Sequence, residues 1–461
     1  MTRLPIVQAP ADEPVVPVQC IRTGELERAL ATLSEQDRRF AAAQGFKAKA
    51  GALVLLPDRD GGIGRVLFGL GAADAPDRTP LLPGRLAQEL PDGLYRLEGE
   101  GFDPVLASLA FALGAYRFER YRKPKEGKAR LLLPQAADGE EITRIAESVQ
   151  FARDLINIPA NDLGPAELAA AGREMAEGYG ASVSIVSGEA LEKGYPMIAA
   201  VGAASERPPL LLDFAWGDER HPKVTLVGKG VAFDTGGLDI KGASGMLLMK
   251  KDMGGAANVL ALARMIMDAG LKVRLRVLVA AVENAISGSA FRPGDILRSR
   301  KGLTVEIGNT DAEGRLILAD ALALADEEAP ELVVSMATLT GAARVALGPD
   351  LPPFYCDDEG FSADLARSAA AVHDPLWRMP FWRPYDSWLA SKTADLGNIS
   401  HNSHAGSIVA ALFLDRFVEK AKTYAHFDIF AWNPSARPYG PEGGEAQAIR
   451  ALYHLLRARH S

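Results

Sequence analysis

The chain has 461 residues, of which 48% are hydrophobic and 24% are charged, which is ordinary globular composition and enough length for two or three domains. Its formal net charge of -8 provides no overall basic field that would attract nucleic acid or an anionic membrane. The two cysteines, Cys20 and Cys356, are too few and too far apart in the sequence for a disulfide framework or a thiolate metal cluster. This cysteine usage fits a reducing cytoplasm.

The N-terminal segment does not resemble a secretory signal. Its sequence, MTRLPIVQAPADEPVV, lacks a basic segment followed by an apolar run. The longest apolar stretches, at 105–116 and 407–414, fall well short of the roughly 20 residues that a helix needs to span a bilayer. We therefore expect a soluble cytoplasmic protein with no membrane contact and no nucleic-acid partner.

Residues 1–137 are predicted to form a small α/β domain. Between 50 and 134, short apolar runs such as ALVLLP, RVLFGLG and ARLLLP alternate with helix-like segments, which is the pattern of strands packed against helices. Residues 124–128, PKEGK, are loop-like. No dense group of polar residues interrupts this region, so its sequence indicates no chemistry.

A long amphipathic pattern at 140–157 stops before Pro159, because the residue before a proline disfavours helical geometry. We expect residues 138–158 to form a connecting helix. From 159 to 461, strand-like and helix-like segments alternate, which is typical of a mostly parallel sheet covered by helices in a larger α/β domain. The clearest strands are expected at 182–187, 209–216, 223–230 and 272–282, with a helix at 255–270.

The stretch NTDAEGRLILADAL, at 309–322, places charged side chains at every second position just before an apolar helix pattern. A strand over 303–311 and a helix over 315–327 would leave these side chains on the turn between them, and loops at strand ends are where sites are built. The simpler alternative is that residues 309–311 form a turn and that Arg315 is a solvated charge. The charged residues are Asp311, Glu313 and Arg315.

Three more stretches carry charged groups within apolar or glycine-rich sequence, namely VGKGVAFDTGG (227–237), LDIKG (238–242) and KKDMGGAA (250–257). Clustered carboxylates would repel one another and raise their pKa values, so such a cluster normally holds divalent cations. Oxygen-rich ligation suits Zn²⁺, Mn²⁺ or Mg²⁺, and two bridged ions can turn a shared water into hydroxide near neutral pH. The carboxylates are Asp234, Asp252, Asp311 and Glu313, and the cations are Lys229, Lys241 and Arg315.

Each of these residues also has a simpler interpretation. Asp252 could cap a helix, Asp234 could form a turn before two glycines, and both lysines could be solvated. Agreement among four stretches favours the metal site. Other motifs have less support, because the GKG at 228–230 fits neither a phosphate loop nor GxGxxG, and no HExxH or GxSxG is present. The pair His401 and His404 is interpreted as ordinary loop histidines.

Taken in chain order, VGKGVAFDTGG, IKG, KDMGGAA and NTDAEGRL resemble the leucyl aminopeptidase family of two-metal exopeptidases, the cytosol aminopeptidases of peptidase family M17. The eight-residue last block is the family's signature, and the spacing of all seven charged residues fits it. The resemblance extends from RDLINIPANDLGP (153–165) through VENAISGSAFRPGD (282–295) and ATLTGA (337–342) to AHFDIFAW (425–432). The N-terminal 135 residues match only in general pattern.

The resemblance implies an aminopeptidase with two divalent metal ions, Zn²⁺ or Mn²⁺, in each subunit. It implies that Asp234 and Glu313 bridge both ions and that Asp311 completes the tighter site. Lys229 and Asp252 would complete the second, exchangeable site. Because a lysine can bind a metal only as the neutral amine, burial and two adjacent cations would have to lower its pKa.

By the same resemblance, a metal-bridging hydroxide attacks the first peptide carbonyl and releases the N-terminal amino acid. Lys241 would stay charged and donate a hydrogen bond to the gem-diolate oxyanion as it forms. Arg315 would hold a bicarbonate ion that acts as the general base. The free α-amine of the peptide would bind the exchangeable metal, so N-acetylation of the substrate should abolish turnover.

The resemblance also implies a pocket for the first side chain at Met249, Thr338, Leu339 and Gly341, although Met249 and Leu339 could simply be core residues. Phe430 departs from the family pattern, because well-known members have a small residue there. SGSAFRPGD likewise replaces SGNAYRPGD, and Leu247 stands where an aspartate is common. None of these removes a ligand, but a phenyl ring could reshape the pocket and change the preference for leucine.

Two alternatives stay open at this point. A dipeptidase or cysteinylglycine hydrolase could use the same site, and a panel of dipeptides would separate the two activities. A non-catalytic binding protein could use the acidic cluster as a structural metal site, with the N-terminal domain engaging a partner, but such a protein has no use for Lys241 and Arg315 beside a metal pair. Family members are hexamers, so we expect a homo-hexamer that acts on peptides with a free N-terminus.

Overall fold

The computed structural model describes residues 4–9, 13–123 and 129–461. The chain divides into two compact units, of which the first comprises Met1–Gln150 with Ser435–Glu442 and the second comprises Phe151–Pro434 with Gly443–Ser461. Nothing in the sequence indicates that residues 435–442 group with the first unit. Helix α5 (Gly139–Asn157) confirms the helix expected at 140–157, whereas the loop expected at 124–128 lies outside the described residues.

The first unit is built on one sheet. In the part of it that the structure describes, the strand order is β1-β6-β5-β2-β4-β3, and every pair is parallel except β4 with β3. The sequence does not predict β2, because Pro17 lies within it and prolines are rare inside sheets. Its elements are β1 (Ile6–Val7), β2 (Val15–Arg22), η1 (Thr23–Glu25), α1 (Leu26–Ala31), α2 (Glu35–Ala43), β3 (Leu53–Pro57), β4 (Ile63–Gly71), η2 (Leu82–Arg85), α3 (Leu86–Glu89), β5 (Gly93–Glu98), α4 (Pro104–Gly114) and β6 (Ala129–Leu132).

The second unit contains a larger sheet, whose strand order among the described residues is β15-β14-β17-β13-β9-β10-β8-β7. Its central strands β17, β13, β9 and β10 run parallel, whereas β14 and β8 pair antiparallel with β17 and β10. This confirms the expected mostly parallel sheet. The strands are β7 (Ser182–Ser187), β8 (Leu210–Trp216), β9 (Lys223–Asp234), β10 (Arg274–Asn284), β13 (Leu332–Ala337), β14 (Pro353–Tyr355), β15 (Trp377–Met379) and β17 (Thr423–Asp428); smaller sheets contain β11 (Ile296–Arg298), β12 (Thr304–Glu306) and β16 (Leu396–Gly397), and β18 (Trp432–Asn433) with β19 (Gly443–Gly444).

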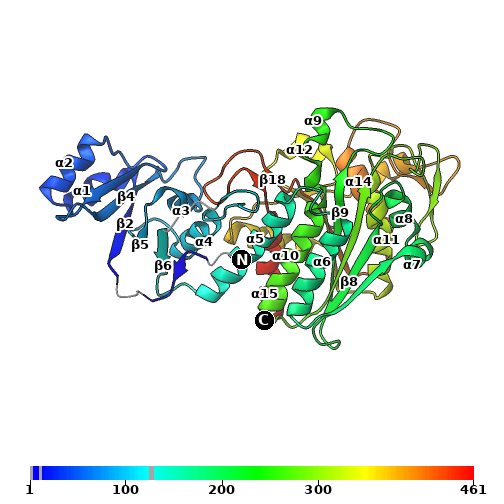
Figure 1. Ribbon diagram of the computed structural model, residues 1–461, viewed down its shortest axis with the longest axis horizontal. Coiled ribbons are helices and arrows are strands. Elements are labelled where there is room, and N and C mark those ends of the chain that lie inside the picture. The colour runs from blue at the N-terminus through cyan, green and yellow to red at the C-terminus, as the bar shows by residue number, and fades with distance from the viewer. Residues whose placement is uncertain (1–3, 10–12, 124–128) are drawn as a thin grey trace. The chain divides into compact units, whose positions relative to one another are not determined.

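Helices cover both faces of this larger sheet (Figure 1). Helices α6, α10 and α15 lie on one face, and α8, α11 and α14 lie on the other. Because both faces are covered, the central strands are buried along almost their whole length, which explains their nearly continuous apolar sequence. The helices are α6 (Pro165–Gly178), α7 (Gly188–Gly194), α8 (Pro196–Gly202), α9 (Ala243–Met246), η3 (Met249–Met253), α10 (Gly254–Asp268), α11 (Glu313–Glu327), α12 (Gly341–Leu347), α13 (Glu359–Ala371), η4 (Arg383–Leu389), α14 (Gly406–Asp415) and α15 (Ile449–His460).

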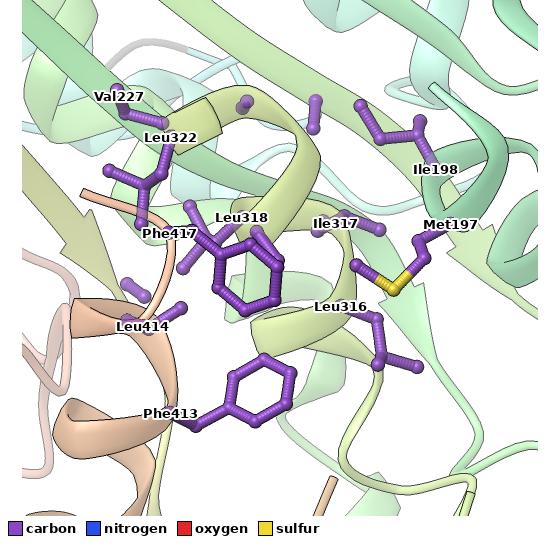
Figure 2. Close-up of a cluster of buried hydrophobic side chains, with 14 of the residues drawn as sticks. Met197, Ile198, Val227, Leu316, Ile317, Leu318, Leu322, Phe413, Leu414 and Phe417 are labelled. Atoms are coloured by element: carbon purple, nitrogen blue, oxygen red, sulfur yellow. The ribbon is translucent and has the colours of Figure 1, made fainter. Parts of the chain in front are cut away.

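Helix α11 is anchored by a cluster of buried apolar side chains (Figure 2). Leu318 and Leu322 of α11 belong to the same cluster as Phe413 and Phe417, from α14 and the turn after it, and Ile198 of α8. Burying a side chain of this kind contributes about 1.5–3 kcal/mol. The cluster therefore fixes the position of the helix whose first turn carries the charged residues of the signature block.

The described part of the chain contains no helix with both the length and the apolar character that crossing a bilayer requires.

Candidate metal centre

Strand β9 supplies two of the charged residues, since Lys229 lies within it and Asp234 ends it. The turn that follows depends on Gly236, which has a φ of 89° and where a Cβ would lie only 2.5 Å from a backbone oxygen. Beyond the turn, the Lys241 N–H donates a hydrogen bond to the Thr235 carbonyl at 2.9 Å. The glycines of DTGG thus fold Lys241 back beside the end of β9.

The signature block differs from its predicted secondary structure. The strand predicted over 303–311 is confirmed only at β12 (Thr304–Glu306) and is wrong beyond residue 306. Gly308 and Asn309 donate their N–H groups to the Asn398 side chain, at 2.7 and 3.4 Å, instead of to a neighbouring strand. Helix α11 begins at residue 313 and not at 315, so Glu313 and Arg315 lie in its first turn and only Asp311 lies on the preceding turn.

Asp252 lies in η3, two residues before α10 begins. The helix-cap interpretation of Asp252 is wrong, because the N-cap of α10 is Met253 and has no side-chain cap. The Asp252 Oδ1 instead accepts a hydrogen bond from the Thr338 hydroxyl at 2.7 Å. Asp234 does form a turn, since its Oδ1 accepts from the Gly236 N–H at 2.8 Å, but its other oxygen faces the cluster.

Three buried carboxylates converge at the carboxyl end of the parallel strands, where open α/β sheets usually place their sites. One oxygen from each of Asp234, Asp252 and Glu313 lies within 4.8 Å of the others, and all three residues are at most 3% exposed. Asp311 joins them through Lys241, whose Nζ lies 2.8 Å from Asp234 Oδ2 and also contacts Asp311 Oδ1.

Lys229 lies among the buried carboxylates. Its Nζ is 2.7 Å from Asp252 Oδ2 and 2.9 Å from Glu313 Oε1, and it donates a hydrogen bond to the Thr338 carbonyl at 3.0 Å. A Cβ at Gly314 would lie 2.7 Å from this nitrogen, which explains the glycine of the EGR sequence. The interpretations of Lys229 and Lys241 as solvated lysines are wrong, since their side chains are only 3% and 16% exposed.

The electrostatics of the cluster depend on its lysines. Burial lowers the pKa of Lys229, but the negative charges of Asp252, Glu313 and Asp234 outweigh burial and raise it overall. Burial and the charge of Asp234 raise the pKa of Glu313 to about 8. The negative charge of the cluster is thus offset by the charged lysines, and it is reduced further because Glu313 tends to stay protonated. The neutral Lys229 expected beside two cations stays a prediction.

The carboxylate cluster fits divalent metal ions. Glu313 Oε2 is buried and accepts no hydrogen bond from any residue that the structure describes. Asp252 Oδ2 and Glu313 Oε1 have only their ion pairs with Lys229 and no hydrogen bond of good geometry. Unsatisfied carboxylate oxygens in the interior are costly, whereas an oxygen-rich donor set of this kind suits Mn²⁺ or Zn²⁺.

Arg315 is 8% exposed, so its interpretation as a solvated surface charge is wrong. One of its nitrogens donates a hydrogen bond to the Asn398 carbonyl at 2.6 Å, while its Nε is buried and has no hydrogen-bond partner in the described part of the chain. Burial lowers its pKa to about 10, against the opposing charges of Glu313 and Asp428. A guanidinium with a free donor beside a cavity fits a small planar anion.

These residues share one cavity of about 730 Å³, here called the site cavity. Glu313 is the exception, because it does not line the cavity itself but forms an ion pair with Lys229, which does. Leu339 also packs against the apolar cluster of Figure 2, while Leu247 is 79% exposed. Sequence-predicted residues that line the site cavity are Lys229, Asp234, Lys241, Met249, Asp252, Asp311, Arg315, Thr338, Leu339, Gly341 and Phe430.

The sequence interpretation missed two cations that line the site cavity. Lys251 Nζ lies 4.8 Å from the centroid of the Phe430 ring, and Arg344 Cζ lies 4.9 Å from it. Burial lowers the pKa of Lys251 to about 8; Asp252 opposes this shift, and Lys229 and Arg344 add to it. The only sequence signal was the KKD run before a predicted ligand. His401 and His404 are exposed in a loop, as expected.

Two family models cover most of the chain. Residues 150–453 match the model described as cytosol aminopeptidase family, catalytic domain, and residues 16–134 match the M17 aminopeptidase N-terminal domain. The chain belongs to the cytosol aminopeptidase family. It is therefore a metal-dependent aminopeptidase, a hydrolase of peptide bonds, and neither the dipeptidase nor the binding-protein alternative finds support.

Cytosol aminopeptidases from several organisms resemble the chain over most of its length. Probable cytosol aminopeptidases from Nocardia farcinica and Geotalea uraniireducens are 40% and 39% identical, over 90% and 79% of this chain and 86% and 77% of theirs. The structure of the Coxiella burnetii cytosol aminopeptidase is similar with a TM-score of 0.94 and 46% identity, covering 99% of both chains. The bottromycin maturation enzyme BotP in complex with Mn has a TM-score of 0.86 and 34% identity, covering 96% of this chain and 99% of its own.

Proposed function

We propose that the cluster at the end of β9 binds two divalent ions, Mn²⁺ or Zn²⁺, and that the chain releases N-terminal amino acids there from peptides with a free α-amine. The observation that carries this proposal is the buried Oε2 of Glu313, which accepts no hydrogen bond from the described residues, within a group of three converging carboxylates. BotP, a similar protein, is known as a complex with Mn, which supports manganese.

Five residues hold the two ions in this proposal. Asp234 and Glu313 would be ligands of both ions, Asp311 would complete one site, and Lys229 with Asp252 would complete the exchangeable one. Binding requires both lysines to give up ion pairs, because Lys229 must lose a proton and Lys241 must leave Asp234 and Asp311. When bound, the ions lower the pKa of a water molecule and polarise the carbonyl to be cleaved.

Lys241 and Arg315 perform the remaining chemistry. Lys241 lines the site cavity, and once metal ions neutralise its carboxylate partners, its ammonium is free to donate a hydrogen bond to the oxyanion. The Arg315 Nε, which has no hydrogen-bond partner among the described residues, supports the binding of bicarbonate, which would supply a proton acceptor for the attacking water. The guanidinium thus holds in place a base that the chain itself lacks.

The first side chain of the substrate contacts Met249, Thr338, Leu339 and Gly341. Their place in the site cavity, beside the carboxylate cluster, supports this role. Phe430 adds an aromatic wall to the same cavity, so the preferred side chain need not be leucine.

Residues 159–461 form the catalytic domain in this proposal, joined through the helix of 138–158 to an N-terminal α/β domain of residues 1–137. In support, all seven charged residues of the centre lie in the second unit. The enzyme acts in the cytoplasm as a homo-hexamer. Exposed apolar side chains near the cavity, including Val345 at 86% and Leu247 at 79%, favour burial between subunits, and the mass of the native assembly measures this.

The metal proposal is tested by counting the ions bound. Chelator-stripped protein should take up two Mn²⁺ per chain in equilibrium dialysis, with one ion released more readily than the other. It should release protons on binding, because Lys229 must become neutral. A protein that binds no Mn²⁺ or Zn²⁺, or a single ion only, would contradict the proposal.

A further inference from the structure

The site cavity has a second group of charges, separate from the carboxylate cluster. Lys251, Arg344 and Phe430, here called the cationic wall, come from η3, α12 and the segment after β17. The two cations lie 4.8 and 4.9 Å from the centroid of the same phenyl ring. All three side chains line the site cavity.

Both cations lack an anionic partner. Among the residues that the structure describes, neither the Lys251 ammonium nor the Arg344 guanidinium forms a hydrogen bond or an ion pair. Lys251 is only 4% exposed, whereas Arg344 is exposed at the mouth of the cavity that it lines. Asp428 cannot serve them, because its oxygens already accept hydrogen bonds from the backbone of Leu339 and Thr340 and from the Thr340 hydroxyl, at 3.0, 3.1 and 2.6 Å.

Contact with an aromatic ring does not account for this arrangement. A cation beside a ring gains about 0.5–2 kcal/mol, whereas burying an ammonium without a hydrogen-bond acceptor costs several kcal/mol. Two like charges at one ring also repel each other. An anion that enters the cavity between them would satisfy both cations at once.

We propose that the cationic wall binds the side-chain carboxylate of an N-terminal glutamate or aspartate, so that the enzyme prefers peptides that begin with an acidic residue. This inference rests on the proposed function, because the wall shares its cavity with Met249, Thr338 and Gly341, the positions proposed for the first side chain. Arg344 can bind a carboxylate through two parallel hydrogen bonds. Phe430 covers the methylene groups of the substrate, and Lys251 supplies the second charge.

The test compares the anilides of glutamate and glutamine, which have nearly the same shape and differ in charge. With Mn²⁺-loaded enzyme, kcat/KM for the glutamyl anilide should exceed that for the glutaminyl anilide by about tenfold or more, the value of one charged hydrogen bond. Calorimetry provides a readout that does not depend on turnover, and free L-glutamate should bind more tightly than L-glutamine. Alanyl and leucyl anilides complete the panel.

Variants of the cationic wall test whether it causes the preference for an acidic first residue. Arg344→Gln should reduce the ratio of glutamyl to glutaminyl turnover to near one, Arg344→Lys should retain part of it, and Lys251→Met should lower it as well. Lys392→Gln, at an exposed lysine outside the site cavity, should leave the ratio as it is. Circular dichroism verifies that each variant is folded.

Failure of this inference differs from failure of the proposed function. If the enzyme cleaves leucyl or glutaminyl anilide with metal but glutamyl anilide no better, or if Arg344→Gln keeps the full ratio, the acidic preference is refuted and the aminopeptidase stands. If no anilide with a free amine is cleaved in the presence of Mn²⁺ or Zn²⁺, the proposed function itself fails.

Discussion

Glu313 has two buried carboxylate oxygens, and neither accepts a hydrogen bond from the described residues. We expect Glu313→Gln to weaken the binding of both ions, since it removes the carboxylate that is proposed to hold them and keeps the side-chain volume. Losing a group that merely orients a ligand costs about 10-fold to 100-fold in metal affinity, so the loss of the ligand should cost at least about 100-fold. Mn²⁺ titration followed by calorimetry measures this.

Glu327→Gln is the matched control, because Glu327 lies at the other end of the same helix and pairs with Arg300 at the surface. It should leave Mn²⁺ affinity unchanged. Equal affinities for the two variants would show that Glu313 is not a ligand.

Arg315 should make turnover depend on bicarbonate. In buffer freed of carbon dioxide, added bicarbonate should raise kcat of the parent enzyme, and it should have little effect on Arg315→Gln, which keeps no guanidinium to hold the anion. Arg298→Gln, at an exposed arginine, should respond like the parent. A bicarbonate response that survives in Arg315→Gln would contradict the proposed role.

A residue of the site could be predicted from the sequence when it stands in a short motif, but not when its role depends on contacts with distant segments. The seven charged residues of the centre could be predicted, because they stand in four short stretches that can each be recognised without knowledge of the fold. Lys251 and Arg344 could not, because their nearness to Phe430 joins three segments that are far apart in the sequence. The burial of Lys229 also depends on residues far along the chain, including Gly314.

Helix α11 should lose stability when its buried face is shortened. Leu318 is fully buried in the apolar cluster of Figure 2, so Leu318→Ala leaves a cavity and should lower the free energy of unfolding by about 2–5 kcal/mol. Urea denaturation measures the change. Lys392→Ala, at an exposed lysine outside the apolar cluster, should stay within about 0.5 kcal/mol of the parent. A comparable loss in both variants would mean that the cluster does not hold α11.

Strand β17, which pairs with β13, contains a histidine that should make stability depend on pH. His426 is 1% exposed, and its Nδ1 lies 2.9 Å from the Ser335 hydroxyl. Burial lowers its pKa from 6.5 to about 3, with a further contribution from the charge of Arg315. Between these values the unfolded chain binds more protons than the folded one, so the free energy of unfolding falls as the pH falls.

When the pH is lowered from about 7.5 to about 5, the free energy of unfolding should fall in both proteins. We expect this fall to be smaller in His426→Phe than in the parent by about 2 kcal/mol. Urea midpoints at the two pH values provide the comparison. His404→Phe, at an exposed loop histidine, should follow the parent. Parallel pH profiles for His426→Phe and the parent would show that His426 does not remain neutral in the fold.

The elements were predicted well where the apolar pattern decides them. The strand expected at 182–187 is β7 without any change, and the expected helix of 255–270 is α10, shifted by one or two residues. The strand expected at 303–311 has only three residues, because the backbone N–H of Gly308 donates to the Asn398 side chain and not to a neighbouring strand. A pattern of alternating residues cannot indicate a hydrogen-bond partner about ninety residues away.

The chain folds into two units, and the second unit contains the residues that match the catalytic domain of the family. The α/β alternation and the parallel sheet followed from the sequence, since both depend on the repeated apolar runs. The grouping of residues 435–442 with the first unit did not, because it depends on tertiary contacts and not on local pattern.

Hydrolysis by chelator-stripped protein provides the decisive comparison, before and after Mn²⁺ or Zn²⁺ is restored. The substrates are anilides of leucine and glutamate, each with a free and with an acetylated α-amine. We predict that stripped protein is inactive, that either metal restores cleavage, and that only anilides with a free amine are cleaved. Activity that survives stripping, or cleavage of the acetylated anilides, would contradict a metal-dependent aminopeptidase that holds its substrate by the α-amine.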